Sequence, residues 1–311
     1  MVRYSPIVYR LAGPHYYHYT NIKNMAEEVL KDLLPKFISH LEGKKRSPST
    51  VLAYRADLEQ LLETLLTKEK VTPSQVMQAD IEMFRDALLS QKYTPKSVSR
   101  KLNAVKTFFR FLVTERKLAS NPAEIVSHPK IDPAVPKYLS PLEYRALRDT
   151  VRADARIAAI TEIILQTGMR ISEVANLKLA NVNNVGVVIE AYATQQQRTV
   201  PLNRPARLAL EEYLKVRPQT NSPYVFVSKN GKPLAVRNIR AAIDRYIQKA
   251  EVPKYSVNDL RTTFIIENLK AGVDLIMLSQ VSGHKRLSTT ERYLELAQVN
   301  EPGKKQVLTE L

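Results

Sequence analysis

A run of prolines near residue 130 places the strongest limit on how this chain can fold. The segment NPAEIVSHPKIDPAVPKYLS, residues 121–140, carries prolines at positions 122, 129, 133 and 136. Because proline removes a backbone donor and clashes with the preceding turn, no helix continues through this segment. We interpret residues 129–137 as a linker between two domains, and a chain of 311 residues is long enough for both to bury a core.

The first half of the chain is expected to be helical. Three segments combine a hydroxyl residue at a cap position with apolar residues that return every three or four positions. These starts are Ser49-Thr50, Thr72-Pro73 and Thr94-Pro95, and in the last two a proline takes the first helical position. They predict a compact helical domain over residues 25–128. An arm over residues 1–24 precedes it, in which tyrosines, basic residues and prolines mix without periodicity.

The second half mixes helices with a small sheet. Helices are predicted for SPLEYRALRDTV, capped by Ser140, and for ARIAAITEIILQTG, which Gly168 ends. The β-branched segments GVVIEAYA and RTVPL, joined by TQQQ, indicate a hairpin, and YVFVS before the Asn230-Gly231 turn is a further candidate strand. The predicted fold is therefore mainly α with a small β-sheet: a helical N-terminal domain followed by a mixed α/β domain over residues 138–296.

The charge balance points to a polyanionic partner. The chain carries 47 Lys and Arg against 31 Asp and Glu, a formal net charge of +16, with a pI ≈ 9.8. Nucleic acid is the first candidate, although a basic surface without such a partner has the same composition. There is no cysteine and the five histidines are scattered, so no thiolate chemistry and no zinc-ligand cluster is expected. No stretch approaches the about 18 apolar residues of a membrane span, and we expect a cytoplasmic protein.

Two helix starts in the second half carry residues that can hold a phosphate. After the break at Gly168, Arg170 and Glu173 are three residues apart and can pair on one helix surface. An ordinary surface ion pair has the same spacing, so this pattern alone does not indicate a site. In the segment NDLR, Asn258 and Arg261 share one face of a second helix.

The segment GHKRLSTTERYLEL adds a histidine and a tyrosine. Its STTE run, residues 288–291, has the spacing of a capping box, so a helix is predicted to begin at Ser288 and to carry Tyr293 in its second turn. The break at the cap lets His284 and Tyr293 face one substrate atom. A tyrosine on a helix is more often a half-buried packing residue, so the spacing permits a joint site without proving one.

Two arginines, a histidine and a tyrosine together suit phosphoryl transfer without a metal. An arginine fork matches the non-bridging oxygens of a phosphodiester and stays charged at working pH. It can stabilise the added charge of a pentacoordinate transition state, and an imidazole supplies a further donor. The tyrosine hydroxyl can act as nucleophile and store the phosphate as a covalent ester. Such a set would cut a DNA strand and keep the bond energy for rejoining it.

Several segments resemble the tyrosine site-specific recombinases of the phage-integrase and Xer type. TGMRISEVANLKLANV, NDLRTTF and SGHKRLSTTERYLEL look like the signature segments of those enzymes. SPSTVLAYRADLEQL and TPKSVSRKLNAVKTFFRFLVTERKLASNPAEIV look like their helical core-binding domain. The resemblance covers roughly residues 27 to 297, and several motifs in order are more specific than one. It implies a core-binding domain over residues 25–128 and a tyrosine-recombinase catalytic domain over residues 138–296.

The resemblance also implies a role for each candidate residue. Arg170 and Arg261 hold the scissile phosphate, and His284 assists them. Tyr293 attacks, and Glu173 supports the first arginine. Enzymes of this kind form a 3′-phosphotyrosyl link, release a 5′-hydroxyl and exchange strands with a second duplex through a Holliday junction. The implied partners are double-stranded DNA with specific sites and three further copies of the chain in a tetramer, and no metal, ATP or other cofactor is implied.

Two positions depart from the family pattern. Asn258 stands where His or Lys is usual, and its amide can donate to a phosphate oxygen but carries no proton at neutral pH. The family's general-acid lysine is missing, because alignment on Val200-Pro201-Leu202 puts Ala193 at its position, and the nearest cation, Arg198, is a poor acid. General acid catalysis is worth about 10²–10⁴ in rate. Three explanations stay open: an acid from elsewhere, such as Lys229 or a water; a slow enzyme regulated by assembly; or a relative with weakened cleavage.

Further contacts with DNA are expected from both domains. The resemblance places the helix that begins at Thr94-Pro95 in the major groove. The candidate DNA-binding residues are Lys96, Arg100, Lys101, Lys106 and Arg198. For each of them the alternative is a solvated surface charge. The tail, residues 297–311, can dock on a neighbouring protomer or fray at the end of the chain.

We expect a site-specific DNA recombinase. Two alternatives remain: a type IB topoisomerase-like enzyme that relaxes supercoils with the same nucleophile, and a noncatalytic protein that holds or bends a recombination site. Site-dependent strand exchange separates the first reading from the second, and failure to form any covalent DNA adduct would favour the third. Integration of a mobile element is one outcome that such an enzyme serves, beside excision, inversion and dimer resolution.

Overall fold

The computed structural model describes residues 28–132, 135–191 and 195–297 of the chain. The chain divides into two compact units, with the boundary between Ile131 and Asp132. This boundary falls inside the proline-rich segment 129–137, and each unit is described below by itself. The predicted arm, most of the predicted tail and Ala193 lie outside the described residues.

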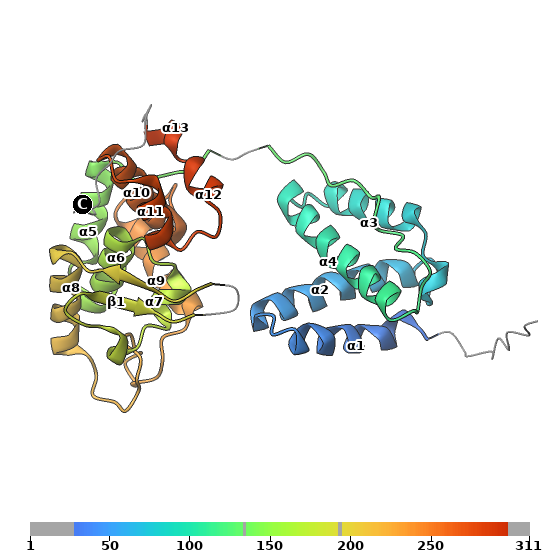
Figure 1. The fold of residues 1–311 in the computed structure, drawn as a ribbon, viewed down its shortest axis with the longest axis horizontal. Helices are drawn as coiled ribbons and strands as arrows, with labels where there is room; N and C mark the ends of the chain where they lie inside the picture. Colours follow the sequence, from blue (N-terminus) through green and yellow to red (C-terminus); the bar gives the residue numbers. More distant parts are fainter. Residues whose placement is uncertain (1–27, 133–134, 192–194, 298–311) are drawn as a thin grey trace, which may run out of the picture. The chain divides into compact units, whose positions relative to one another are not determined.

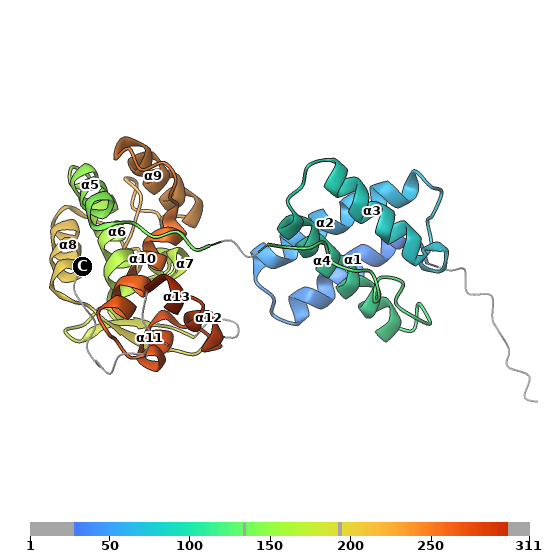
Figure 2. The same ribbon diagram turned by 90° about the horizontal axis from the view of Figure 1, so that it is seen from above.

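The first unit is built from α-helices (Figures 1 and 2). They are α1 Leu30–Gly43, α2 Pro48–Leu66, α3 Gln78–Ser90 and α4 Pro95–Thr114. Helix α2 packs against α1 and α4, and α3 packs against α4. Aromatic rings fill the centre of this bundle, where Phe37 of α1 meets Phe108 of α4 edge to face with ring centroids 5.3 Å apart. The helical domain predicted for this half is therefore present.

The helix starts of the first unit follow the prediction in one case and correct it in another. The hydroxyl of Thr94 accepts a hydrogen bond from the backbone N–H of Ser97 at 3.2 Å, as predicted for α4. The cap predicted at Ser49-Thr50 is wrong, because α2 already begins at Pro48 and Ser47 caps it by accepting from the backbone N–H of Thr50 at 3.2 Å. Proline fits the first helical position because its fixed φ is helical, so the helix begins earlier in the sequence than predicted.

The helix predicted from Thr72-Pro73 is interrupted. Residues Pro73–Gln75 form only a 3₁₀ turn, and α3 begins at Gln78. The side-chain oxygen of Gln75 turns back and accepts from the backbone N–H of Thr72 at 3.0 Å. The backbone N–H of Met77 then donates to the carboxylate of Asp80 at 2.8 Å, which begins α3 as a separate helix.

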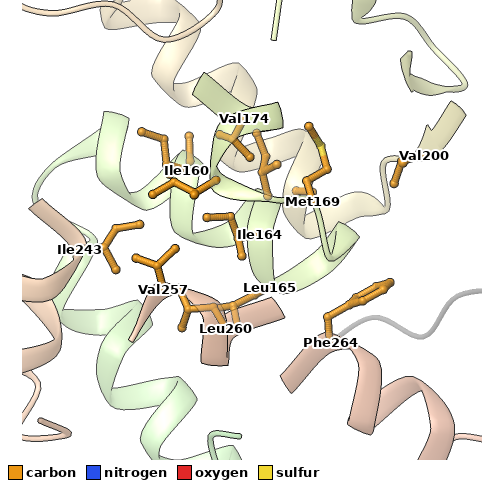
Figure 3. Packing of buried hydrophobic residues seen from close by; sticks show 14 of the residues in the cluster. Ile160, Ile164, Leu165, Met169, Val174, Val200, Ile243, Val257, Leu260 and Phe264 are labelled. Atoms are coloured by element: carbon orange, nitrogen blue, oxygen red, sulfur yellow. The ribbon is translucent and has the colours of Figure 1, made fainter. Parts of the chain in front are cut away.

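The second unit places one buried helix, α6, at the centre of a mixed α/β arrangement (Figures 1 and 2). Helix α6 packs against α5, α7, α8, α9 and α10. Figure 3 shows the buried core around it, in which Ile160 and Ile164 of α6 face Val257 and Leu260 of α10. The helices of this unit are α5 Pro141–Val151, α6 Ala155–Thr167, α7 Ile171–Ala175, α8 Arg204–Val216, α9 Val236–Lys249, α10 Val257–Lys270, α11 Leu275–Ser282, α12 Ser288–Glu291 and α13 Leu294–Ala297.

Both helix boundaries predicted at the start of this unit are confirmed. Ser140 caps α5, and its hydroxyl accepts from the backbone N–H of Glu143 at 3.3 Å. Gly168 ends α6 with φ +62, a left-handed conformation that glycine adopts at little cost. A Cβ at Gly168 would lie 2.3 Å from the ring of Phe264, so the close approach of α10 also requires glycine here. The chain turns at this point into Met169 and Arg170.

The predicted hairpin forms the sheet of this unit. Strands β1, Gly186–Ile189, and β2, Arg198–Pro201, pair antiparallel, with Val187 opposite Val200 and Ile189 opposite Arg198. The further strand predicted at YVFVS is not a paired strand, because only isolated bridges, Lys178 with Tyr224 and Val227 with Pro233, form in this region. The described part of the chain is mainly helical with one small sheet, as predicted.

Candidate active site

The second unit contains an open hollow of about 330 Å³ that gathers four of the predicted site residues. Its lining comes from the turn after α6, the start of α7, the first two turns of α10 and the segment between α12 and α13. The lining residues are Met169, Arg170, Ile171, Ser172, Val257, Asn258, Arg261, Thr262 and Tyr293. Residues that are up to 124 positions apart in the sequence, Met169 and Tyr293, thus meet at one surface.

Arg170 enters the hollow as the residue that precedes α7. Its backbone N–H donates to the carboxylate of Glu173 at 2.8 Å, so Glu173 caps the short helix. The guanidinium of Arg170 donates to the other oxygen of Glu173 at 3.1 Å and, more weakly, to the side-chain oxygen of Gln195 at 3.4 Å. The pair predicted at this spacing is present, and it differs from an ordinary surface pair because the Glu173 side chain is only 9% exposed.

Arg261 enters the same hollow from α10. Its guanidinium donates to the carbonyl of Ser282 at 2.6 Å and to the carbonyl of Gly168, the residue that ends α6. Burial, together with the charge of Arg170, lowers the pKa of Arg261 to about 9. The side chain still carries its charge at neutral pH, so the hollow holds two cations, of which Arg170 pairs with Glu173 and Arg261 is bound by backbone carbonyls. An anion in the hollow would gain from both.

The C-terminal end of α11 is the common partner of the arginines. The carbonyl of Ser282 also accepts from Arg170 at 3.3 Å, and the carbonyl of Gly283 accepts from Arg170 at 2.8 Å. The last carbonyls of a helix lack partners within the helix and carry its partial negative charge. These carbonyls therefore hold the guanidinium groups in place, and no motif in the sequence pointed to them.

Arg198 joins Arg170, Arg261 and Glu173 in one cluster of charged side chains, and its guanidinium is bound inside the unit. Its side chain is 12% exposed and donates to Glu173 at 2.8 Å and to the carbonyl of Val281 at 2.9 Å. Burial by itself would raise the pKa of Glu173. Hydrogen bonds from Arg198 and from the backbone N–H of Arg170 outweigh burial, so the pKa of this carboxyl is lowered. Strand alternation carries the signal for this orientation, since Arg198 lies on the same face of β2 as buried Val200.

His284 directly follows Gly283, whose carbonyl binds Arg170, but it is not among the residues that line the hollow. Its Nδ1 is 2.7 Å from the hydroxyl of Thr290, which is fully buried and so fixes the orientation of the ring. Burial, followed by the charges of Arg261 and Arg170, lowers the pKa of His284 to about 4. In the free protein the imidazole is therefore neutral at pH 7 and can donate one hydrogen bond.

The low pKa of His284 makes a prediction for stability. Its pKa is about 4 in the folded state against an ordinary value of 6.5, so the unfolded chain binds this proton more readily. The contribution of the neutral ring is complete above pH 6.5 and is lost progressively as the pH falls towards 4. We expect the denaturant midpoint of the wild type to fall more than that of His284→Gln over this range. Equal falls in the two proteins would show that His284 titrates normally.

Tyr293 lies in the hollow, but the helix that carries it differs from the prediction. Helix α12 begins at Ser288 as predicted, but it ends at Glu291 and the capping box predicted at Ser288 is absent. Leu287 precedes it with φ −59 and ψ −36, so the chain is already helical before Ser288 and leaves no extended cap residue. Tyr293 follows in the junction between α12 and α13, where its backbone N–H donates to the carbonyl of Thr290 at 3.0 Å.

The ring of Tyr293 is half-buried against the core of the unit, and α13 packs against α10, the helix that carries Arg261. Within the described residues, no hydrogen bond to the hydroxyl of Tyr293 is recorded. Asn258 lies at the start of α10, is exposed and lines the same hollow. Lys229, a candidate acid, is exposed on a turn and is not a lining residue.

The DNA-contact candidates of the first unit differ in how they are engaged. Lys96 is exposed, whereas Arg100, one turn later on α4, is half-exposed and its guanidinium donates to the carboxylate of Asp57 at 3.0 Å. Lys101 is buried, and its ammonium donates to Asp57 at 2.9 Å and to Gln60 at 2.8 Å. It therefore stabilises the inside of the unit. Lys106 donates to the backbone carbonyl of Glu124 at 3.2 Å.

Among residues 28–132, 135–191 and 195–297, no three His, Asp or Glu side chains lie close enough together to hold a metal ion. No helix in the same residues is both long and apolar enough to cross a membrane.

Comparison with known proteins covers both units. Residues 137–299 match the phage integrase family, and residues 34–116 match the phage integrase N-terminal SAM-like domain. A relative named tyrosine recombinase XerC from Chlorobaculum parvum is 33% identical over 298 residues, covering 84% of this chain and 89% of the relative. The protein of the same name from Myxococcus xanthus is 31% identical, covering 86% of this chain and 94% of the relative.

Solved structures resemble the fold at lower sequence identity. A lambda integrase tetramer bound to a Holliday junction is 13% identical with a TM-score of 0.72, covering 86% of this chain and 78% of that one. The Tn1549 transposon integrase in complex with circular intermediate DNA is 19% identical with a TM-score of 0.69, covering 85% of this chain and 94% of that one. At these identities the likeness establishes the fold.

Proposed function

Because the chain belongs to the phage integrase family, whose relatives here are tyrosine recombinases, and is a DNA-cleaving and rejoining enzyme, we propose that Tyr293 is its nucleophile. The observation that carries this assignment is the hollow in which Tyr293, Arg170 and Arg261 meet. We further propose specific paired sites on double-stranded DNA as its substrate. Two guanidinium groups beside a tyrosine hydroxyl suit a phosphodiester better than any neutral substrate.

The first step follows from this arrangement. The Tyr293 hydroxyl attacks the scissile phosphorus, the bond to the 5′-oxygen breaks, and the phosphate becomes a 3′-phosphotyrosyl ester. Arg170 and Arg261 bind the non-bridging oxygens and stabilise the extra charge of the transition state. In the second step the 5′-hydroxyl of a partner duplex attacks the same phosphorus and releases Tyr293, so the number of phosphodiester bonds is unchanged and no external energy source is needed.

The surroundings prepare both arginines before DNA arrives. The carbonyls of Gly168, Ser282 and Gly283 hold the guanidinium groups, and Glu173 holds Arg170 from the other side. Positioned donors stabilise a transition state more than mobile donors because no reorganisation is needed when charge develops. A bound phosphate would also raise the pKa of His284, because it offsets the arginine charges that depress it.

The proton for the leaving 5′-oxygen needs a source other than a lysine in the hollow. The cationic side chains among the lining residues are Arg170 and Arg261, and arginine is a poor acid. We assign this proton to water or to a group that arrives with the assembled complex. General acid catalysis contributes about 10²–10⁴ in rate, so an enzyme without a fixed acid is expected to turn over slowly.

One experiment separates recombination from the topoisomerase-like alternative. Two linear duplexes with a candidate site are incubated with the protein, in parallel with a supercoiled plasmid that carries the same site once. Recombination predicts recombinant duplexes and four-way junction intermediates that depend on the site in both partners. Relaxation of the plasmid without any exchange between the duplexes would instead favour the topoisomerase reading, for which none of the relatives described above gives support.

We propose that the active assembly is a homo-tetramer on two duplexes. The support is that a lambda integrase of the same fold was solved as a tetramer on a Holliday junction. Complete exchange between two duplexes also cuts four strands, and each cut needs its own nucleophile. Sedimentation with synthetic four-way junctions is expected to give four chains per junction, and a complex limited to two chains would contradict the proposal.

Lys96 and Arg100 are the proposed DNA contacts of the first unit. They lie four residues apart on one face of α4, and half of the Arg100 side chain stays exposed although its guanidinium also binds Asp57. Double substitution by alanine is expected to weaken DNA binding and to reduce the salt slope of log K by about 2, since each phosphate contact contributes about one. Lys31 on α1 supplies a matched control, because it is an exposed lysine on another helix of the same unit. A slope unchanged from wild type would remove α4 from the interface.

A further inference from the structure

Arg198 is the one buried cation of the cluster for which the proposed reaction has no task. It stands at the first position of β2, directly after the hairpin loop, and it does not line the hollow. Its side chain reaches Glu173 and the end of α11, and only 12% of it is exposed. A charge buried to this degree is costly unless it is paired, so its partners reveal what it does.

Arg198 binds the same segments that hold the reacting groups: Glu173 of α7, which binds Arg170, and the end of α11, which His284 follows. One end of the guanidinium donates to Glu173 at 2.8 Å, and Nε donates to the carbonyl of Val281 at 2.9 Å. Glu173 in turn binds Arg170 at 3.1 Å. Arg198 thus joins three segments, β2, α7 and the end of α11, through a single planar group.

The contact with the end of α11 is close as well as polar. A Cβ at Gly283 would lie 2.6 Å from the central carbon of the Arg198 guanidinium, and Gly283 has φ +63. Glycine at position 283 therefore suits both the left-handed end of α11 and the close contact with the guanidinium of Arg198. The next residue is His284, whose position depends on this turn, and the carbonyl of Gly283 accepts from Arg170.

This arrangement makes Arg198 a connection between the hairpin and the reacting groups. Arg170 alone binds both oxygens of Glu173, one through its side chain and one through its backbone N–H, but these contacts do not join Glu173 to any other segment. Arg198 adds a donor to the oxygen that the backbone N–H of Arg170 binds, and so ties the carboxylate to β2 and to the end of α11. Its planar fork can bind Glu173 and Val281 at the same time, whereas the single ammonium of a lysine cannot span both with the same geometry.

We propose that Arg198 is a positioning residue that locks Glu173, and through it Arg170, to the turn that carries His284. The proposal rests on the proposed function of the site. It replaces the sequence-based expectation that Arg198 contacts DNA, since both donors named above are engaged inside the protein. It also assigns a task to the hairpin in a chain that lacks the family lysine there: strand β2 supplies a cation that supports the site from behind Glu173.

The test compares Arg198→Gln and Arg198→Lys in the full-length protein. In Arg198→Gln, covalent adduct formation on a suicide duplex is expected to slow about 10²-fold, the cost of a displacement of about 1 Å in a reacting group. Arg198→Lys keeps the charge but not the fork, and is expected to slow less, with partial recovery relative to glutamine. DNA binding, measured by fluorescence anisotropy, is expected to remain within a factor of two or so of wild type in both, since no phosphate contact is lost.

A second measurement responds to the charge of Arg198 inside the site. The charge of Arg198 contributes to the depressed pKa of His284, after burial and the charges of Arg261 and Arg170. Imidazole resonances in NMR, assigned with His284→Gln, are expected to titrate at higher pH in Arg198→Gln and at an unchanged pH in Arg198→Lys. A purely structural role would not produce this difference between two folded variants.

Arg207→Gln is the matched control. Arg207 lies in the same unit and donates to the backbone carbonyl of Asn184 at 2.8 Å, away from the hollow. This variant is expected to keep wild-type adduct formation and an unchanged titration of His284. If Arg198→Gln folds and forms the adduct as fast as Arg207→Gln, the proposal is overturned. If Arg198→Gln does not fold, a wild-type rate in Arg198→Lys overturns it equally.

Gly283→Ala gives an independent check. The added methyl group would displace the guanidinium of Arg198, so adduct formation is expected to slow. In the Arg198→Gln background the same substitution is expected to cost less, since the group it displaces is gone. Additive costs would overturn the connection. An absence of adduct in the wild type would count against the proposed function instead, because every comparison here starts from an active wild type.

Discussion

Replacement of Tyr293 by phenylalanine is expected to abolish the covalent protein–DNA adduct and to leave the protein folded. The substitution removes only the hydroxyl, and the half-buried ring keeps its packing against the core of the second unit. Phenylalanine offers no atom that can form a phosphate ester. Nicked suicide duplexes that carry candidate sites, or a pool of sequences, trap the adduct, and a denaturing gel shows it as a protease-sensitive band.

Tyr246→Phe is a suitable control, because Tyr246 is also partly buried against the same core but lies on α9 and does not line the hollow. It is expected to give a wild-type band. A band that persists in Tyr293→Phe would mean that another group attacks the phosphate. Absence of a band in the wild type, despite demonstrated binding to a cognate site, would revive the noncatalytic alternative.

The parts of the site that local sequence signals control were predictable. A glycine that stops α6 and the R-x-x-E spacing after it place Arg170 and Glu173 correctly, because both depend on neighbours within three residues. The same holds for the start of α10, which presents Asn258 and Arg261 on one face. That these two segments meet at one hollow came from the resemblance, since nothing in either segment specifies the other.

The orientation of Arg198 was missed because it was interpreted by its nearness to the turn. Alternation along β2 was available and gives the right answer, since Arg198 is two residues from buried Val200. The partners of Arg198 could not be predicted in the same way. They include the backbone carbonyl of Val281, which every residue type possesses and which therefore leaves no trace in the sequence.

The helix start at Ser288 was predicted correctly, but the capping box and the extension of this helix to Tyr293 were not. The STTE spacing satisfied the capping-box pattern, yet a box needs an extended residue at the cap, and Leu287 makes the chain helical before Ser288. The hydroxyl of Thr290 then pairs with the ring of His284. A tertiary contact to an imidazole thus uses one of the residues of the predicted box.

Arg261→Gln is expected to slow adduct formation by about 10²–10³-fold, the usual cost of removing one preorganised donor from a developing charge. DNA binding is expected to change much less, because one phosphate contact among many is lost. The single-turnover rate at saturating protein separates the two effects. The substitution also removes a donor from the carbonyls of Gly168 and Ser282. If no water replaces it, the free energy of unfolding falls by about 1–3 kcal/mol.

This loss of stability must not be mistaken for loss of chemistry, and Arg217 allows the two to be separated. Its guanidinium also binds backbone carbonyls, those of Val225 at 3.0 Å and Tyr224 at 2.8 Å, but it does not line the hollow. Arg217→Gln is therefore expected to lower the melting temperature by a similar amount and to keep the wild-type adduct rate. Equal slowing in both variants would show that Arg261 only holds α6 to α11. A large difference at equal stability would place its charge on the scissile phosphate.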